Sequence, residues 1–231
     1  MEKTKRYIIF ILGLLVNSLG VSLVTKANLG TSPISSIPYV LSMNFSLSLG
    51  TFTVLFSLLL IWFQLLILQK NFKIEHLLQI PVAFAFGIFI DLSMALLGFL
   101  APEQYGMKFF CLVLGCLILG IGVYMEILAD VVMLPGESLV RSIVFRWKRE
   151  FGLTKVAFDV SMTIGAGIIS LLLAGKVAGV REGTVIAAVL VGFIARLIGS
   201  RLAFFSNILF TVPVHSPCKN SGQCGHDVEN T

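Results

Sequence analysis

Long apolar runs separated by short polar segments dominate the chain. Six runs approach or exceed about 18 residues, the length that a helix needs to cross a bilayer. They occupy residues 7–25, 51–69, 77–100, 108–128, 153–175 and 183–210. Residues 34–46 are apolar but too short to cross, and residues 135–150 predict a second short helix, which carries basic side chains. The pattern predicts an all-α, polytopic membrane protein with six transmembrane helices.

The segment after the first run has a counterpart after the fourth. Residues 27–36 read ANLGTSPISS and residues 129–138 read ADVVMLPGES. The two segments align without a gap at an offset of 102 residues, which pairs Gly13 with Gly115 and Pro33 with Pro135. Two copies of a unit with an odd number of spans must insert in opposite directions. We therefore predict two inverted three-helix repeats, each with a short half-helix that starts at proline after its first span.

This interpretation divides the chain into three parts. Residues 1–104 form the first membrane repeat, residues 105–211 the second, and residues 212–231 a polar cytoplasmic tail. The run at 7–25 is long for the apolar part of a cleaved signal peptide, and no small-x-small cleavage site follows it. We therefore expect it to remain as the first span.

Composition supports a membrane protein and gives its orientation. The 231 residues are 57% hydrophobic and 13% charged, with a mean hydropathy of +0.96, whereas soluble domains are about a quarter charged. With both termini inside, twelve of the 17 Lys and Arg residues lie on the inner side, four lie outside and Arg196 lies within a span. This distribution follows the positive-inside rule, so the net charge of +5 does not indicate a nucleic-acid partner.

The first predicted half-helix suits an anion. A helix that starts within the membrane leaves its first N–H groups unpaired, and its dipole adds positive charge there. Ser32 is a favourable N-cap and Pro33 suits the first helical position. Such an end favours a small anion or a carboxylate. The candidate binding residues of this segment are Asn28, Thr31, Ser32, Ser35 and Ser36.

The second predicted half-helix carries its own carboxylate. Glu137 falls in the first turn, next to Ser138. Glu137 either satisfies the free amides, holds a cation, or pairs with Arg141 four residues later. For both half-helices the alternative is an interfacial loop that simply joins two spans.

Ionisable residues within apolar runs are costly, and they usually face a bundle interior or a water-filled path. Asp91 and Arg196 occupy aligned positions in the two halves, which predicts either an ion pair or a substrate anion held by Arg196 beside Asp91. A pair that only fixes the helix register is the alternative. Glu126 and Asp130, at the end of the fourth run, are candidates for a proton or a cation, unless they are merely solvated at the helix end.

The tail contains His215, Cys218, Cys224 and His226, whose spacing matches no standard zinc-finger pattern. We therefore expect no metal site, and an exposed tail is the simpler interpretation. The sequence also has no Gly-rich phosphate loop, HExxH motif or nucleophile elbow. We expect no enzymatic activity and no cofactor.

Residues 20–39 and the later segment Leu134-Pro135-Gly136-Glu137-Ser138 resemble the bacterial YczE/YitT-like integral membrane proteins. The resemblance covers residues 5–205 and excludes the tail. It implies a protein of the bacterial inner membrane, but it implies no substrate and no catalytic residue.

Two functions fit these features. The first is a small secondary transporter or permease for a small solute, for which an anion is one candidate, with a site at the midplane between the two repeats. The second is a non-transporting accessory or scaffold protein for a membrane enzyme or an export system, which would dock through residues 141–150. The lipid bilayer is the expected partner in both cases, and either a homo-oligomer or a complex with another membrane protein is compatible with the sequence.

Overall fold

The computed structural model describes residues 2–69, 74–175, 179, 181–191 and 194, and this part of the chain is helical without strands. The helices, with one short 3-10 helix, are α1 (Glu2–Lys26), α2 (Pro33–Asn44), α3 (Leu49–Leu68), η2 (Ile74–Leu78), α4 (Gln79–Leu96), α5 (Tyr105–Ala129), α6 (Pro135–Trp147) and α7 (Phe151–Ala174). An apolar helix at Glu182–Val191 follows. The all-α prediction is confirmed.

Five helices of the described residues are long and apolar enough to cross a membrane, namely α1, α3, α4, α5 and α7. They correspond to the first five predicted spans. The sixth predicted span, 183–210, begins in the helix Glu182–Val191, and its remainder lies outside the described residues, as does the tail at 212–231. A count of six spans therefore stays a prediction.

The largest contact between helices joins α1 to α5, and glycines allow it. A methyl group on Gly20 would lie 2.6 Å from the backbone nitrogen of Leu119, and one on Gly122 would lie 2.6 Å from the backbone nitrogen of Asn17. Both distances are too short for a real side chain. Only glycine lets the two backbones approach so closely, as small residues commonly do between membrane helices.

This contact, which we call the α1–α5 seam, is antiparallel. Gly13, midway along α1, faces Glu126 close to the end of α5. Gly115, midway along α5, faces Val24 close to the end of α1. The glycines that the sequence alignment pairs therefore take equivalent places at opposite ends of the seam.

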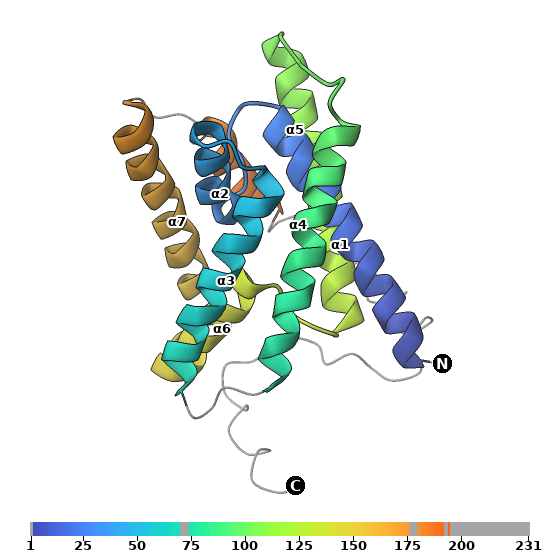
Figure 1. Ribbon diagram of the computed structural model, residues 1–231, viewed down its shortest axis with the longest axis vertical. Coiled ribbons are helices and arrows are strands. Elements are labelled where there is room, and N and C mark those ends of the chain that lie inside the picture. Colours follow the sequence, from blue (N-terminus) through green and yellow to red (C-terminus); the bar gives the residue numbers. More distant parts are fainter. Residues whose placement is uncertain (1, 70–73, 176–178, 180, 192–193, 195–231) are drawn as a thin grey trace, which may run out of the picture.

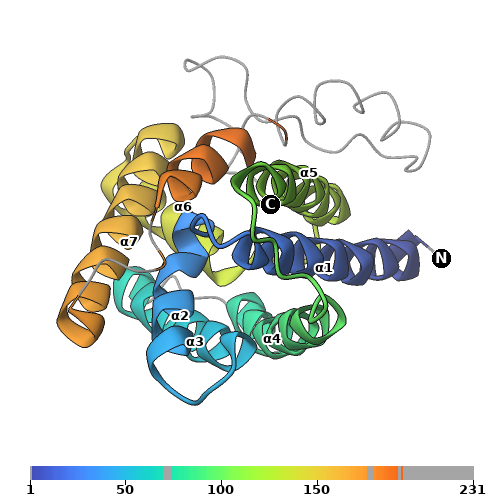
Figure 2. The same cartoon turned by 90° about the horizontal axis from the view of Figure 1, so that it is seen from above.

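The two short helices lie on opposite halves of the molecule. Figure 1 shows α2 in the upper half and α6 in the lower half. α2 packs on α7, and α6 packs on α3. Seen from above in Figure 2, α2 lies between α7 on one side and α1 on the other. Each short helix begins at a buried proline. Proline has no N–H, and an N–H at the first helical position would find no acceptor within the helix.

The α1–α5 seam gives a first test. We expect Gly20→Ala to destabilise the protein by about 1–3 kcal/mol, because the added methyl group has no room against Leu119. The measurement is thermal unfolding of the purified protein in detergent. Gly167→Ala is the matched control, since no atom lies within 4 Å of its added methyl group and alanine favours a helix interior. Equal stability of the two variants would contradict the close approach at the seam.

Candidate functional site

The starts of α2 and α6 meet inside the bundle. A side chain on Gly136 would overlap Cδ1 of Ile34, so the second residues of the two helices are in contact. Leu60 of α3 lies beside the same point. Ile34 belongs to a cluster with Leu60, Leu139, Val140 and Phe158 that joins α2, α3, α6 and α7. Two helix N-termini, with their partial positive charges, therefore converge on one region.

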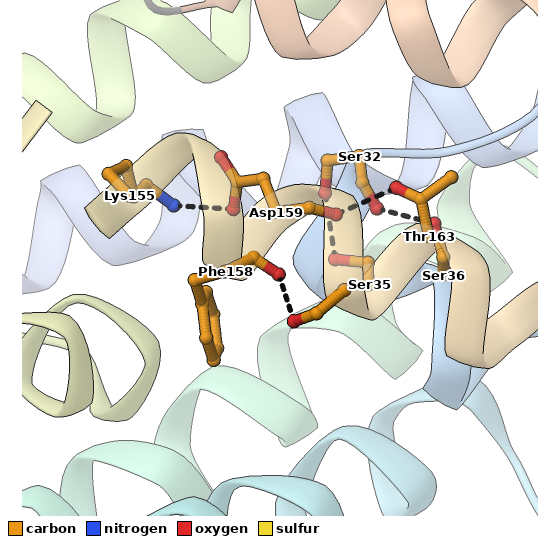
Figure 3. A network of polar contacts seen from close by, with 8 residues as sticks. Ser32, Ser35, Ser36, Lys155, Phe158, Asp159 and Thr163 are labelled. Atoms are coloured by element: carbon orange, nitrogen blue, oxygen red, sulfur yellow. Dashed lines mark hydrogen bonds and ion pairs between the residues drawn. The ribbon is translucent and has the colours of Figure 1, made fainter. Parts of the chain in front are cut away.

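The first turn of α2 is rich in buried hydroxyls. Ser32 takes the N-cap position that the sequence predicts, but its hydroxyl does not cap the helix. It donates instead to Ser35 Oγ at 3.0 Å, while Ser36 Oγ donates to the carbonyl of Ser32 at 3.0 Å. Figure 3 shows these serines beside the stretch of α7 that carries Asp159 and Thr163.

Two further hydroxyls near this turn have no hydrogen-bond partner. Thr31 is fully buried and Thr184 is 1% exposed, and neither Oγ1 is bonded within the described part of the chain. Gly183 N donates to the carbonyl of Leu29 at 2.9 Å, which holds the helix Glu182–Val191 against the segment before α2. A buried hydroxyl without a partner costs about 1–3 kcal/mol, so these two hydroxyls do not stabilise the fold through hydrogen bonds within the described residues.

The first turn of α6 is closed by a ring of three buried side chains. Gln64 Nε2 donates to Gln79 Oε1 at 3.2 Å, Gln79 Nε2 donates to Ser138 Oγ at 2.8 Å, and Ser138 Oγ donates to Gln64 Oε1 at 2.9 Å. Gln64 Nε2 also donates to the carbonyl of Pro135 at 2.9 Å. Ser138, a predicted binding residue, is thus fully occupied in a structural network that joins α3, α4 and α6.

Glu137 projects from the same turn of α6 and is half-buried. Its carboxylate does not cap the helix, and among the described residues it forms no ion pair with Arg141, which is exposed. Burial raises the pKa of Glu137, and the charge of Asp159 adds to this, while Lys155 and Arg141 lower it. Lys155 itself pairs with Asp159 at 2.9 Å along α7. Glu137 therefore favours its protonated form more than an exposed carboxyl does.

Asp91 caps a neighbouring helix. Its Oδ2 accepts a hydrogen bond from Ser48 Oγ at 2.7 Å, and its Oδ1 accepts one from Gly50 N at 2.8 Å. Both oxygens thus serve the N-terminus of α3, whose dipole favours a carboxylate. The predicted partner of Asp91, Arg196, lies outside the described residues, so their pairing stays a prediction.

The remaining predicted site residues are spread out. Glu126 accepts a hydrogen bond from Asn17 Nδ2 at 2.8 Å within the α1–α5 seam. Asn28 and Asp130 are exposed and lie just past the ends of α1 and α5, in the left-handed conformation common after helices. No group of three or more potential metal ligands occurs among the described residues, and the four residues of the tail motif lie outside them.

Sequence reasoning missed several residues that shape this region. Asn17, Gln64 and Gln79 are buried amides within or beside predicted spans, and Thr184 stands at the start of one. A neutral amide in an apolar run is the one available signal, because a buried amide needs partners. The residues that meet in space are too far apart in sequence for spacing to reveal them.

The glutamine ring yields a second test. Gln64→Met keeps the length of the side chain but leaves Gln79, Ser138 and the carbonyl of Pro135 short of partners. We expect a loss of about 1–3 kcal/mol in the free energy of unfolding. Gln104→Met, at an exposed position before α5, is the control. An unfolding midpoint in detergent equal to that of the control would mean that the ring does not hold α6.

Comparison with known proteins places the chain among uncharacterised membrane proteins. A family model described as a family of unknown function (DUF6198) matches residues 4–200. The uncharacterized membrane protein YczE of Bacillus subtilis (strain 168) is 27% identical over 198 residues, which cover 84% of this chain and 86% of YczE. The uncharacterized protein YyaS of the same organism is 30% identical over 118 residues, which cover 51% of this chain but only 57% of YyaS. No solved structure matches the chain.

These matches confirm the resemblance to YczE that residues 20–39 and 134–138 indicate. They agree with the five apolar helices of membrane-spanning length, and together they identify an integral membrane protein. The family match extends over most of the chain. The protein belongs to the DUF6198 family of unknown function.

Proposed function

We propose that this protein is a small secondary transporter or permease, and not an enzyme, with a solute site between two inverted repeats. The observation that carries the proposal is the contact between Ile34 and Gly136. These residues are equivalent in the sequence alignment, and each is the second residue of a helix that starts at proline. In secondary transporters, half-helix N-termini of this kind commonly bind the substrate near the midplane.

Several contacts support two inverted repeats. The order of long helix, short helix and long helix occurs as α1, α2, α3 and again as α5, α6, α7. α2 packs on α7, and its counterpart α6 packs on α3, which is the counterpart of α7. Exchanging the halves reproduces these contacts, the contact of each short helix with the next long helix, and the antiparallel seam between α1 and α5.

The chemistry of this region favours a small solute with acceptor atoms. Both helix N-termini point partial positive charge at it, and α2 adds the hydroxyls of its first turn. Glu137 directly follows Gly136, which contacts Ile34. The raised pKa of Glu137 suits a group that gains and loses a proton. We propose that its protonation is coupled to solute movement, because a neutral Glu137 leaves both positive helix ends available to an anion.

A flux experiment tests this proposal. Wild-type protein in proteoliposomes should move small anions such as nitrate or acetate at a rate that depends on pH. Glu137→Gln should reduce the flux by about five-fold or more, an ordinary size for coupling between two sites, and should remove the pH dependence. Glu103→Gln is the control, because Glu103 is exposed in the loop before α5.

Thermal unfolding supplies an independent readout of Glu137. The pKa of Glu137 is higher in the folded protein than in the unfolded chain. The contribution of Glu137 to the free energy of unfolding is therefore fully present below the ordinary carboxyl pKa, and it is lost as pH rises through the folded-state pKa. The wild type should therefore lose stability over this pH range, and Glu137→Gln should lose measurably less. Flux that is insensitive to Glu137→Gln would contradict the coupling role.

The second candidate is a non-transporting scaffold, favoured by the end of α6. This short helix exposes both basic and aromatic side chains, namely Arg141, Phe145, Arg146 and Trp147. A partner that is recovered in equal amount from detergent extracts, together with no flux from pure protein, would favour this function over transport.

We further propose insertion in the bacterial inner membrane with both termini in the cytoplasm, as the distribution of Lys and Arg favours. Single cysteines at Lys148 and Lys108 should then react differently in intact cells after the native cysteines are replaced. A membrane-impermeant maleimide should label position 108 and spare position 148. Labelling of position 148 and not of position 108 would contradict the proposed orientation.

A further inference from the structure

The two half-helices differ in how their first turns are completed. At the start of α6, Glu137 supplies a negative charge whenever it is ionised, and the ring of Gln64, Gln79 and Ser138 occupies the polar groups. The first turn of α2 contains no acidic residue, and Ser35 stands where α6 has Glu137. The positive end of α2 is therefore the less compensated of the two.

The unpartnered hydroxyls lie at this same end. Thr184 Oγ1 is the atom nearest to the position that a side chain on Gly30 would take. Thr31 follows Gly30 directly and precedes the N-cap Ser32, so both hydroxyls belong to the segment that leads into α2. Gly30 has a φ of 118°, a conformation open to glycine, and the absent side chain leaves its backbone against Thr184. Two buried donors thus lie beside a helix N-terminus.

The charged side chains around this segment are mainly basic. Lys26 ends α1 four residues before Gly30, and Arg181 precedes the helix Glu182–Val191. The backbone nitrogen of Arg181 lies 3.2 Å from the position of a side chain on Gly30. The positive charge of Arg181 also reaches Tyr39 of α2, where it opposes the rise in pKa that burial causes. Glu182 is the acidic residue nearby, and it is exposed.

From these observations we infer that a small anion binds at the start of α2, held by the hydroxyls of Thr31 and Thr184. This inference rests on the proposed transport function and adds a substrate class and a position to it. The substrate is a monovalent anion with oxygen acceptors, such as a short carboxylate or nitrate. It binds on the α2 side of the contact between Ile34 and Gly136. The α6 side serves as the fixed counterpart, because its polar groups are already bonded to one another. A helix N-terminus with added donors is an established setting for such ligands.

Thermal unfolding of the full-length protein in detergent tests the site without requiring transport. Sodium nitrate and sodium acetate are each titrated against sodium gluconate at constant ionic strength, so that only specific binding raises the unfolding temperature. We expect a saturable rise for the wild type. Thr31→Val and Thr184→Val should each bind about ten-fold more weakly, the value of one hydrogen bond to a charged group.

The variants without anion should unfold at or above the wild-type temperature, because each substitution removes an unbonded buried hydroxyl. Thr53→Val is the matched control, since its buried hydroxyl already donates to the carbonyl of Leu49 at 2.8 Å. It should keep wild-type affinity. If either valine variant fails to fold, Thr31→Ser and Thr184→Ser retain the hydroxyl and should retain binding.

Two outcomes would overturn the inference. One is the absence of any saturable rise in the wild type, which would leave a buried water as the occupant of these hydroxyls. The other is equal affinity in Thr31→Val, Thr184→Val and Thr53→Val. Flux that survives both threonine substitutions would reject this site while the transporter proposal stands. Anion binding at the site without flux would reject transport while the site stands.

Discussion

The architecture depends on the need to complete two helices that begin inside the bundle. A backbone group without a partner is costly in an apolar interior, and each helix start exposes several of them. Proline removes one N–H donor at each start, and one further N–H is paired within each first turn: Ser35 N donates to the carbonyl of Ser32, and Ser138 N donates to the carbonyl of Leu134. The long helices α1, α3, α4, α5 and α7 surround these points, so the covering of two short helices explains much of the arrangement of the whole.

The same problem is solved differently in the two halves. The α6 start is surrounded by a closed ring of two amides and a serine hydroxyl, whereas the α2 start keeps two hydroxyls unbonded within the described part of the chain. A closed polar network rigidifies the region around it, because every group is held by at least one other. An end with free donors is instead open to a ligand. A rigid side and a ligand-binding side would suit the proposed transport function, in which one element moves against a fixed one.

The sequence predicts the helices well and the polar contacts poorly, for physical reasons. Span length is set by the bilayer, so the predicted 153–175 differs by only one or two residues from Phe151–Ala174. Pro33 and Pro135 mark helix starts because proline suits that position. A carboxylate in an apolar run, such as Asp91, indicates a need for partners, and Ser48 and Gly50 supply them through a contact between α3 and α4 that no spacing reveals. The pairing of Asp91 with Arg196 stays a prediction. Gln64 and Gln79 are harder to predict as polar partners, because an amide carries no charge.

The α1–α5 seam has a further consequence for how such a chain can arise. Gly13 and Gly20 of one helix occupy the places that Gly115 and Gly122 occupy in the other, and the two helices run in opposite directions. An interface of this kind is self-complementary, so two copies of a single half would form it equally well if they entered the membrane in opposite orientations. Under the proposed inverted repeat, fusion of the two copies into one chain would free each half to change alone, so that one helix start could acquire a carboxylate and the other could lose its partners.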